Sequence, residues 1–260
     1  MSRPTIVTPG YYATPEENRV PKTNEKICGA GAYCSSGVRY ACGGVDKYCP
    51  DPGRAKLINV LPLPVVKGWY SNGSADLNRR TQQLQCPPDM YCQGGEKHEC
   101  MEGHYCTPHE KHPCGGAEWY CPEGSDKPIH VTEGFFTIPE HVNKTHRIGQ
   151  HPCPGGFVCE SGTRASCVAG YFCPGGNQKR APCGSAELYC PMNSSRPHLV
   201  KQGHFSTPTG SANENSRTGQ EECGIGYFCV SGRRAKCNDS DTFCPRKGMS
   251  APSKVDAGFF

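Results

Sequence analysis

The apolar residues of this chain recur in short motifs separated by glycine, proline and polar residues. One motif, Val-x-x-Gly followed by two aromatic residues, occurs five times, with His204 in the first aromatic place of the fourth copy. The copies begin at Val7, Val65, Val131, Val200 and Val255. A second motif, Cys-x-x-Gly-x-aromatic-Cys, follows within the repeats. Because glycine permits tight turns and an aromatic ring can cover a neighbouring disulfide, these motifs predict short antiparallel β-hairpins with little or no helix.

The motifs divide the chain into four tandem repeats and the start of a fifth. We expect the boundaries to fall at 1–64, 65–130, 131–199, 200–254 and 255–260. The first and fourth repeats carry four cysteines each, whereas the second and third carry six because one Cys-x5-Cys-x7 step is inserted. Each repeat is expected to contact mainly its neighbours, which predicts a tandem, elongated rod.

The composition indicates what holds such repeats together. Leu, Ile, Val and Phe make up only 37 of the 260 residues, too few for an ordinary core. The 20 Cys, 32 Gly and 24 Pro indicate small disulfide-rich modules in which crosslinks take the place of a core. The cysteines expected in disulfides are Cys28, Cys34, Cys42, Cys49, Cys86, Cys92, Cys100, Cys106, Cys114, Cys121, Cys153, Cys159, Cys167, Cys173, Cys183, Cys190, Cys223, Cys229, Cys237 and Cys244.

The even number of cysteines in every repeat predicts pairing within repeats, but it does not fix the partners. Four cysteines allow three connectivities and six allow fifteen. The inserted step favours pairings that absorb two more cysteines locally.

Disulfides at this density indicate an oxidising compartment, so we expect an extracellular or cell-surface, secreted protein. The residues from Met1 to Ile6 contain no apolar signal segment, and no apolar run is long enough to span a bilayer. Because the same motif stands near both ends, we expect the chain to be cut from a longer array. The net charge of +4 is small and dispersed, which gives no support for nucleic-acid binding.

The succession of these motifs with Arg-Thr-x4-Cys and Cys-Pro resembles the ephrin-receptor-like cysteine-rich repeats of large extracellular proteins, including surface and filament proteins of protists and algae. The resemblance covers nearly the whole chain. It departs at Asp89, which replaces the glycine, at Val158, which replaces the aromatic residue, and at the longer linker after Cys49. The resemblance implies an extracellular, disulfide-bonded and often glycosylated scaffold, and it implies no reaction.

Metal binding is the first alternative use of so many cysteines. Structural zinc sites draw ligand pairs from Cys-x2–4-Cys, whereas every spacing here is five or more. A histidine cluster in the second repeat could hold a metal through imidazoles, and the alternative is that these are exposed loop histidines. The cluster comprises His98, His104, His109 and His112. We expect no metal and no cofactor.

Catalysis is the second alternative. No nucleophile with a base, no paired carboxylates and no phosphate loop is recognisable, and a cysteine in a disulfide is not a nucleophile. Modules of this size also leave little room for a deep pocket. We therefore expect that the protein is not an enzyme.

Four Asn-x-Ser/Thr sequons are candidate N-glycosylation sites: Asn72, Asn143, Asn193 and Asn238. Glycans at these positions would mark solvent-facing surface and would exclude those faces from tight assembly contacts.

The paired aromatic residues are candidates either for the small core of each junction or for an exposed binding stripe. Alternate residues of an extended segment point to opposite faces, so one ring of each pair is expected inside and its neighbour at a junction or on the surface. A basic residue, such as Arg147, lies six positions before the first cysteine of a repeat. Stacking on an aromatic ring and exposure to solvent are both compatible with its position.

The linker after Cys49 is the least repeat-like stretch. Eighteen residues separate Cys49 from Gly68, where the other linkers have 12, 12 and 13. Its prolines suit an extended edge segment. Either the linker packs on its own neighbouring repeats, or it docks on another chain. The candidate partner-binding residues are Leu57, Ile58, Leu61 and Leu63.

These features predict a non-enzymatic extracellular structural protein, a segment of a filament or surface coat such as a flagellar hair. Its partners would be copies of itself or other extracellular chains. The alternative is an adhesion or receptor-type ectodomain, in which the repeats act as ligand-binding module and spacer. A filament subunit should contact its copies through repeated faces, whereas a receptor should carry one divergent surface patch.

Overall fold

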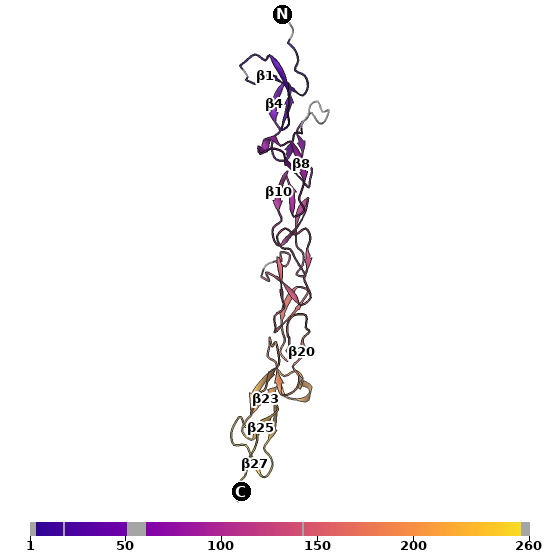
Figure 1. The fold of residues 1–260 in the computed structure, drawn as a ribbon. Coiled ribbons are helices and arrows are strands. Elements are labelled where there is room, and N and C mark those ends of the chain that lie inside the picture. Colours follow the sequence, from indigo (N-terminus) through magenta and orange to yellow (C-terminus); the bar gives the residue numbers. More distant parts are fainter. Residues whose placement is uncertain (1–3, 18, 51–60, 142, 256–260) are drawn as a thin grey trace. The chain divides into compact units, whose positions relative to one another are not determined.

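The computed structural model describes residues 4–17, 19–50, 61–141 and 143–255. In these ranges every sheet is an antiparallel pair of short strands, as predicted (Figure 1). The described ranges contain no α-helix and two single turns of 3-10 helix, η1 (Leu77–Arg79) and η2 (Ser211–Asn213). No helix long and apolar enough to cross a membrane is found among them. The fold is therefore a tandem series of small disulfide-rich modules.

Three kinds of hairpin follow one another in each repeat. The first, called here the opening hairpin, starts at the aromatic pair. The opening hairpins are β1 (Tyr11–Thr14) with β2 (Asn24–Ile27), β7 (Trp69–Asn72) with β8 (Gln82–Gln85), β15 (Phe135–Ile138) with β16 (Gly149–Pro152), and β23 (His204–Thr207) with β24 (Gly219–Glu222). In the third repeat the register places Phe136 opposite His151.

The second kind, the cysteine hairpin, carries a half-cystine on its first strand or directly after it. These hairpins are β3 (Ala32–Ser35) with β4 (Val38–Ala41), β9 (Met90–Gln93) with β10 (Glu96–Glu99), β11 (His104–Thr107) with β12 (Glu110–Pro113), β17 (Phe157–Glu160) with β18 (Thr163–Ser166), β19 (Tyr171–Phe172) with β20 (Ala181–Pro182), and β25 (Tyr227–Val230) with β26 (Arg233–Lys236). The inserted cysteine step of the middle repeats therefore adds one more hairpin of this kind.

The third kind, the closing hairpin, has strands of only two residues. These strands are β5 (Lys47–Tyr48) with β6 (Leu63–Pro64), β21 (Leu188–Tyr189) with β22 (His198–Leu199), and β27 (Thr242–Phe243) with β28 (Ser253–Lys254). In the second repeat the strands at the same place in the sequence are β13 (Trp119–Tyr120) and β14 (Ile129–His130).

Every disulfide joins two cysteines that are consecutive in the sequence, six or seven residues apart. The pairs are Cys28–Cys34, Cys42–Cys49, Cys86–Cys92, Cys100–Cys106, Cys114–Cys121, Cys153–Cys159, Cys167–Cys173, Cys183–Cys190, Cys223–Cys229 and Cys237–Cys244. The structure thus selects the most local of the connectivities that the sequence allows. No disulfide joins one repeat to the next.

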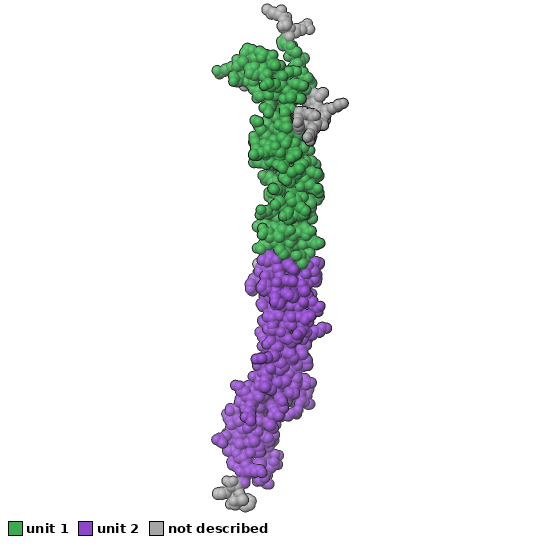
Figure 2. Space-filling view, viewed as in Figure 1, with its two compact units in different colours: residues 1–115, 121–129 green, residues 116–120, 130–260 purple. Residues whose placement is uncertain are grey.

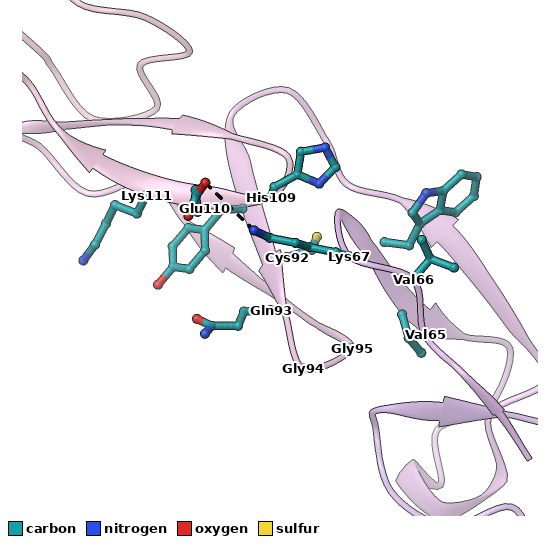
Figure 3. Close-up of a pocket in the computed structure, with 12 residues that line it drawn as sticks. Val65, Val66, Lys67, Cys92, Gln93, Gly94, Gly95, His109, Glu110 and Lys111 are labelled. Carbon is teal, nitrogen blue, oxygen red and sulfur yellow. Dashed lines mark ion pairs between the residues drawn. The ribbon is translucent and has the colours of Figure 1, made fainter.

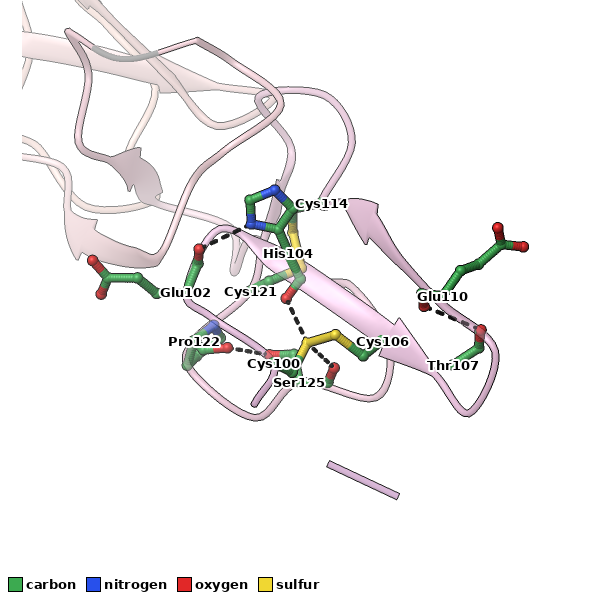
Figure 4. The surroundings of a disulfide bond; sticks show 10 residues. All are labelled: Cys100, Glu102, His104, Cys106, Thr107, Glu110, Cys114, Cys121, Pro122 and Ser125. Atoms are coloured by element: carbon green, nitrogen blue, oxygen red, sulfur yellow. Dashed lines mark hydrogen bonds between the residues drawn. A yellow bond between two sulfur atoms is a disulfide. The ribbon is translucent and has the colours of Figure 1, made fainter. Parts of the chain in front are cut away.

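Figure 4 shows how one of these bonds is surrounded by backbone oxygens. The carbonyl oxygens of His104 and Ser125 lie 3.7 and 3.5 Å from Sγ of Cys100, which has no proton to donate once it is oxidised. The N–H of Cys106 donates to the carbonyl of Ser125 at 2.9 Å. The disulfide loop is therefore fastened to the segment that follows it.

The buried interior consists largely of sulfur. All the cysteines except Cys159 and Cys237 are buried, and the large side chains with less than 2% exposure are cysteines apart from Thr137. Two aromatic residues join them: Phe136 and Phe205 are buried, each the second ring of its pair. In both pairs the first aromatic residue is only half-buried, so one ring lies inside and its neighbour lies toward the surface, as predicted.

The contacts divide the chain into two compact units, shown in Figure 2. The first comprises residues 1–115 and 121–129, and the second comprises 116–120 and 130–260. The segment 116–120 precedes the opening motif of the third repeat but belongs to the same unit as that repeat.

Candidate functional site at the junctions between repeats

Each junction contains a backbone hydrogen bond from the valine that opens a repeat. The N–H of Val131 donates to the carbonyl oxygen of Glu118 at 2.8 Å. The same bond, at the same length, joins Val65 to Asp46, Val200 to Glu187, and Val255 to Asp241. The acceptor is always an acidic residue between the last two cysteines of the preceding repeat, although only its backbone takes part. The valine motif therefore marks the place where one repeat is attached to the one before it.

A buried hydroxyl group reinforces the attachment. Oγ1 of Thr137 donates to the carbonyl of Ala117 at 2.6 Å and lies 3.1 Å from the carbonyl of Gly162. Oγ of Ser206 occupies the same place, 2.6 Å from the carbonyl of Ala186. Thr137 is 0% exposed and Ser206 is 1% exposed, so water does not compete for these carbonyls. The hydroxyl is not evident from the sequence, although a small residue directly follows every described aromatic pair.

A glycine in the turn of the adjoining cysteine hairpin permits this close approach. Gly162 has φ +72°, and its carbonyl accepts the N–H of Thr137 at 3.0 Å. A Cβ added at Gly162 would collide with the carbonyl oxygen of Ala117. The equivalent collisions are those of Gly232 with Ala186 and of Gly95 with Val45. Only a residue without a side chain fits between the two backbones.

A glutamine side chain holds the opening motif from the other side. Oε1 of Gln150 accepts the N–H of Thr132 at 2.7 Å, and Nε2 donates to Oγ1 of the same threonine at 2.9 Å. The equivalent bonds run from the N–H of Val66 to Gln83 and from the N–H of Lys201 to Gln220. Each glutamine lies three residues after the arginine of its repeat, a spacing visible in the sequence. The glutamine therefore ties the opening motif to the second strand of the opening hairpin.

In the first repeat a carboxylate replaces this amide. Oε2 of Glu25 accepts the N–H of Thr8 at 2.9 Å, and Oε1 accepts the Thr8 hydroxyl at 2.7 Å. These bonds stabilise the charged form, and they hold the pKa of Glu25 below its ordinary value, with the backbone bond as the larger cause. The first repeat is thus the one whose opening motif depends on a titratable group.

In the third and fourth repeats the arginine before the first cysteine is buried and binds the backbone of its own hairpin. Arg147 is 4% exposed and Arg217 is 6% exposed. A guanidinium N–H of Arg147 donates to the carbonyl of Pro139, and one of Arg217 donates to that of Gly210 at 3.3 Å. Both acceptors lie in the loop that connects the strands of the opening hairpin. Of the two roles inferred from the sequence, the exposed cation is therefore wrong for these two arginines.

Other cations cover the inner rings. The guanidinium of Arg164 lies 4.9 Å from the ring centre of Phe136, and that of Arg234 lies 4.9 Å from the ring centre of Phe205. In the first two repeats Arg39 lies over the ring of Tyr12 and Lys97 lies over the ring of Tyr70, each with its charged group 5.6 Å from the ring centre. Each cation stands on the second strand of a cysteine hairpin, five residues after a cysteine. Such contacts contribute about 0.5–1 kcal/mol each at exposed sites.

A shallow groove lies beside the opening motif at three of the junctions. In the second repeat it has a volume of about 550 Å³ and lies between the segment from Val65 to Trp69, the end of β9 and the turn from His109 to Lys111 (Figure 3). Nζ of Lys67 and Oε1 of Glu110 face each other across it at 3.9 Å. The grooves at the same place in the third and fourth repeats measure about 1240 and 490 Å³. Open, mixed apolar and charged surfaces of this kind suit contact with another polypeptide.

The four histidines of the second repeat make separate contacts. His98 stacks on Tyr91 and His112 stacks on Tyr105, with ring centres 5.0 and 5.1 Å apart. A ring nitrogen of His104 lies 3.2 Å from the carbonyl of Glu102, and His109 lines the groove. Among the described residues no group of three or more His, Cys, Asp or Glu side chains is placed to hold a metal ion.

The glycosylation candidates lie at the surface to different degrees. Asn143, Asn193 and Asn238 are exposed, whereas Asn72 is half-buried at the end of β7, opposite Gln82. Their modification stays a prediction, which glycopeptide mass spectrometry on native material can test.

The described part of the linker is exposed. Leu61 is 68% exposed and Leu63 is 37% exposed, although the backbone of Leu63 pairs with Tyr48 in the closing hairpin. Leu57 and Ile58 lie outside the described residues. The contact of this linker with another chain stays a prediction.

Comparison with known proteins finds no relative, since no family model and no curated protein matches the chain. The function is therefore inferred from the junctions themselves.

Proposed function

We propose that the chain is a non-enzymatic segment of an extracellular structural protein, a filament or surface coat such as a flagellar hair. In this proposal it is a secreted member of the ephrin-receptor-like cysteine-rich repeats, and it assembles with copies of itself or with other extracellular chains. One observation carries the proposal. The same opening-motif bond recurs at the described junctions, whereas the surface side chains around it vary.

The junction favours an array because it uses groups that every copy of the repeat supplies. Its bonds come from backbone amides, backbone carbonyls and one buried hydroxyl. Such a contact can be repeated along a chain without a new surface at each step, as in other tandem-repeat proteins.

The disulfide pattern supports an extracellular, load-bearing role. Each disulfide encloses five or six residues and stabilises its own turn by about 2 kcal/mol, so each module is fastened independently of its neighbours. A chain fastened in this way keeps its remaining modules folded when one is cut or damaged. An oxidising environment is required for it.

Immunogold labelling of native material tests the proposal. Antibodies raised against the oxidised chain are expected to label fibres or a coat outside the cell at regular intervals. Preimmune serum and antibody absorbed with the purified chain serve as controls. Label on isolated surface molecules, or inside the cell, would contradict the structural role.

A second candidate function, a ligand-binding ectodomain, is favoured by a different observation. The groove of the third repeat has more than twice the volume of the grooves at the same place in the second and fourth repeats. One divergent patch on an otherwise regular array is the feature expected of a receptor.

A further inference from the structure

Two residues that line the larger groove of the third repeat depart from the pattern of the second repeat. In the other cysteine hairpins an aromatic residue precedes the half-cystine that ends the Cys-x5-Cys loop: Tyr33, Tyr91, Tyr105, Phe172 and Phe228. In hairpin β17–β18 that place is taken by Val158, and Ala165 stands opposite it. The corresponding pair in the second repeat is Tyr91 and His98, whose rings stack 5.0 Å apart. The third repeat therefore lacks a pair of rings that fills the same place in the second.

A second departure of the third repeat meets the first at the same groove. Nine residues separate Cys173 from Cys183, where the equivalent spacing in the second repeat is seven. The longer loop brings residues 176–180 to the border of the groove that Val158 and Ala165 line. Two changes in the sequence thus meet at one surface site, and both lie within the second unit.

The lining of the groove shows what it can bind. Phe135, Val158 and Val168 supply apolar surface, and Val168 is 46% exposed. Three carboxylates line it as well: Glu118, Glu133 and Glu160. Within the described ranges none of the three forms an ion pair.

Two basic residues, Lys179 and Arg180, also line the groove, and both are exposed. The guanidinium of Arg180 lies over the ring of Tyr171, 5.2 Å from its centre, and Lys179 is its neighbour. The groove offers an apolar surface beside three carboxylates that form no ion pair with another described residue, and these outnumber its two basic side chains, Lys179 and Arg180.

We propose that this groove binds a segment of a partner protein that presents an aromatic side chain flanked by lysine or arginine. The partner's ring takes the place that the stacked pair of Tyr91 and His98 fills in the second repeat, and its cations approach Glu133 and Glu160. The groove lies beside the junction and shares Glu118, Val131 and Gly162 with it, whereas Thr137 and Ala117 do not line it.

Nuclear magnetic resonance on the full, oxidised, ¹⁵N-labelled chain tests the proposal with three blocked pentapeptides. The probe is Gly-Lys-Phe-Lys-Gly, and its matched controls replace Phe by Ala or both Lys by Glu. The amide signals of residues 131–135 and 158–168 are expected to shift in a saturable way with the first peptide. Loss of the ring should weaken binding at least about tenfold, because a buried phenyl group supplies most of the apolar contact. Replacement of both lysines by glutamate should also weaken binding, and this loss of affinity should be larger at low salt than at high salt.

A double variant, Val158→Tyr with Ala165→His, rebuilds the ring pair of the second repeat inside the groove. It is expected to weaken peptide binding at least about tenfold, while signals outside the third repeat stay in place. Phe228→Tyr, at the same position of the fourth repeat, is the matched control and should bind like the unaltered chain.

The proposal is overturned by equal shifts with the Phe and Ala peptides, by the absence of saturable shifts, or by undiminished binding to the filled variant. It is also overturned if the same signals shift with protein concentration alone, because the occupant would then be a second copy. None of these outcomes bears on the junctions, so the assembly role is tested separately.

Discussion

The hydroxyl oxygen of Thr137 lies 2.6 Å from the carbonyl oxygen of Ala117, which belongs to the preceding repeat. Ser206 and Ala186 repeat this relationship at the same distance one repeat later. Because threonine and serine are both accepted there, the hydroxyl is the required group and the extra methyl is not. A buried hydroxyl thus joins consecutive repeats, beside the backbone bond from the opening valine.

Replacement of Thr137 by Val should weaken this junction by about 1–3 kcal/mol, because the Ala117 carbonyl loses its donor in a place that water does not reach. Hydrogen exchange at the amides of Val131 and Thr137, both of which donate across the junction region, should then become at least about tenfold faster. Thr137→Ser keeps the hydroxyl and is the matched control. Equal exchange in the Val and Ser variants would show that the hydroxyl contributes nothing.

Replacement of Gly162 by Ala should disrupt the same junction. The new methyl group would collide with the carbonyl of Ala117, and the positive φ adds a backbone strain of about 1–3 kcal/mol. Gly176 is the matched control, since it also has a positive φ, +59°, but has no atom within 4 Å of an added Cβ. Thermal unfolding followed by circular dichroism should show a larger loss for Gly162→Ala. Equal losses would mean that φ alone is responsible.

The opening motif of the first repeat should loosen in acid. The pKa of Glu25 is lowered from 4.5 by its bonds to Thr8, so the stability these bonds contribute is present above about pH 4.5. This stability should be lost as the pH falls through the lowered pKa that Glu25 has in the folded chain. The protection factor of the Thr8 amide, which is its exchange rate relative to that of an unstructured peptide at the same pH, measures the effect. Glu25→Gln should remove the pH dependence of this protection factor. A pKa of Glu25 at or above 4.5 in the folded chain would contradict the prediction.

Replacement of Leu61 and Leu63 by Ser should reduce association of the chain without lowering its melting temperature, if the linker docks on another chain. The reason is that Leu61 is already 68% exposed, so little is lost within the chain itself. Sedimentation velocity measures the association. Leu199→Ser is the control, because Leu199 is 74% exposed but lies outside the linker. Unchanged association with a lower melting temperature would show that the linker packs on its own repeats.

The hairpins could be predicted from the sequence because their determinants are local. Glycine and the aromatic residue occur inside the six-residue step between two cysteines, so turn and strand are specified by neighbours. The disulfide partners could not be fixed, because an even count is satisfied by every pairing. What selects Cys153–Cys159, for example, is that the loop brings their Cα atoms to 5.8 Å.

The junction was less accessible to prediction, because its groups come from different repeats. Thr137 looks like an ordinary strand residue until the bond from Val131 to Glu118 brings Ala117 beside it. Arg147 was misjudged for a similar reason, since charge favours the surface but its guanidinium finds a carbonyl acceptor in a loop.

The groove of the third repeat could be predicted from the sequence only in part. The departure at Val158 is visible in the sequence. Its consequence depends on the cross-strand register with Ala165, which the sequence does not specify.

The locality of the disulfides has a mechanical consequence. When the two ends of the chain are pulled apart, each disulfide carries the load past the loop that it closes, and the segments between disulfides are held only by the hydrogen bonds of the hairpins and junctions. Each disulfide withholds from extension only the five or six residues that it encloses. The remainder can unravel and refold around sulfur-closed turns that persist, so the chain can lengthen under tension without breaking a covalent bond.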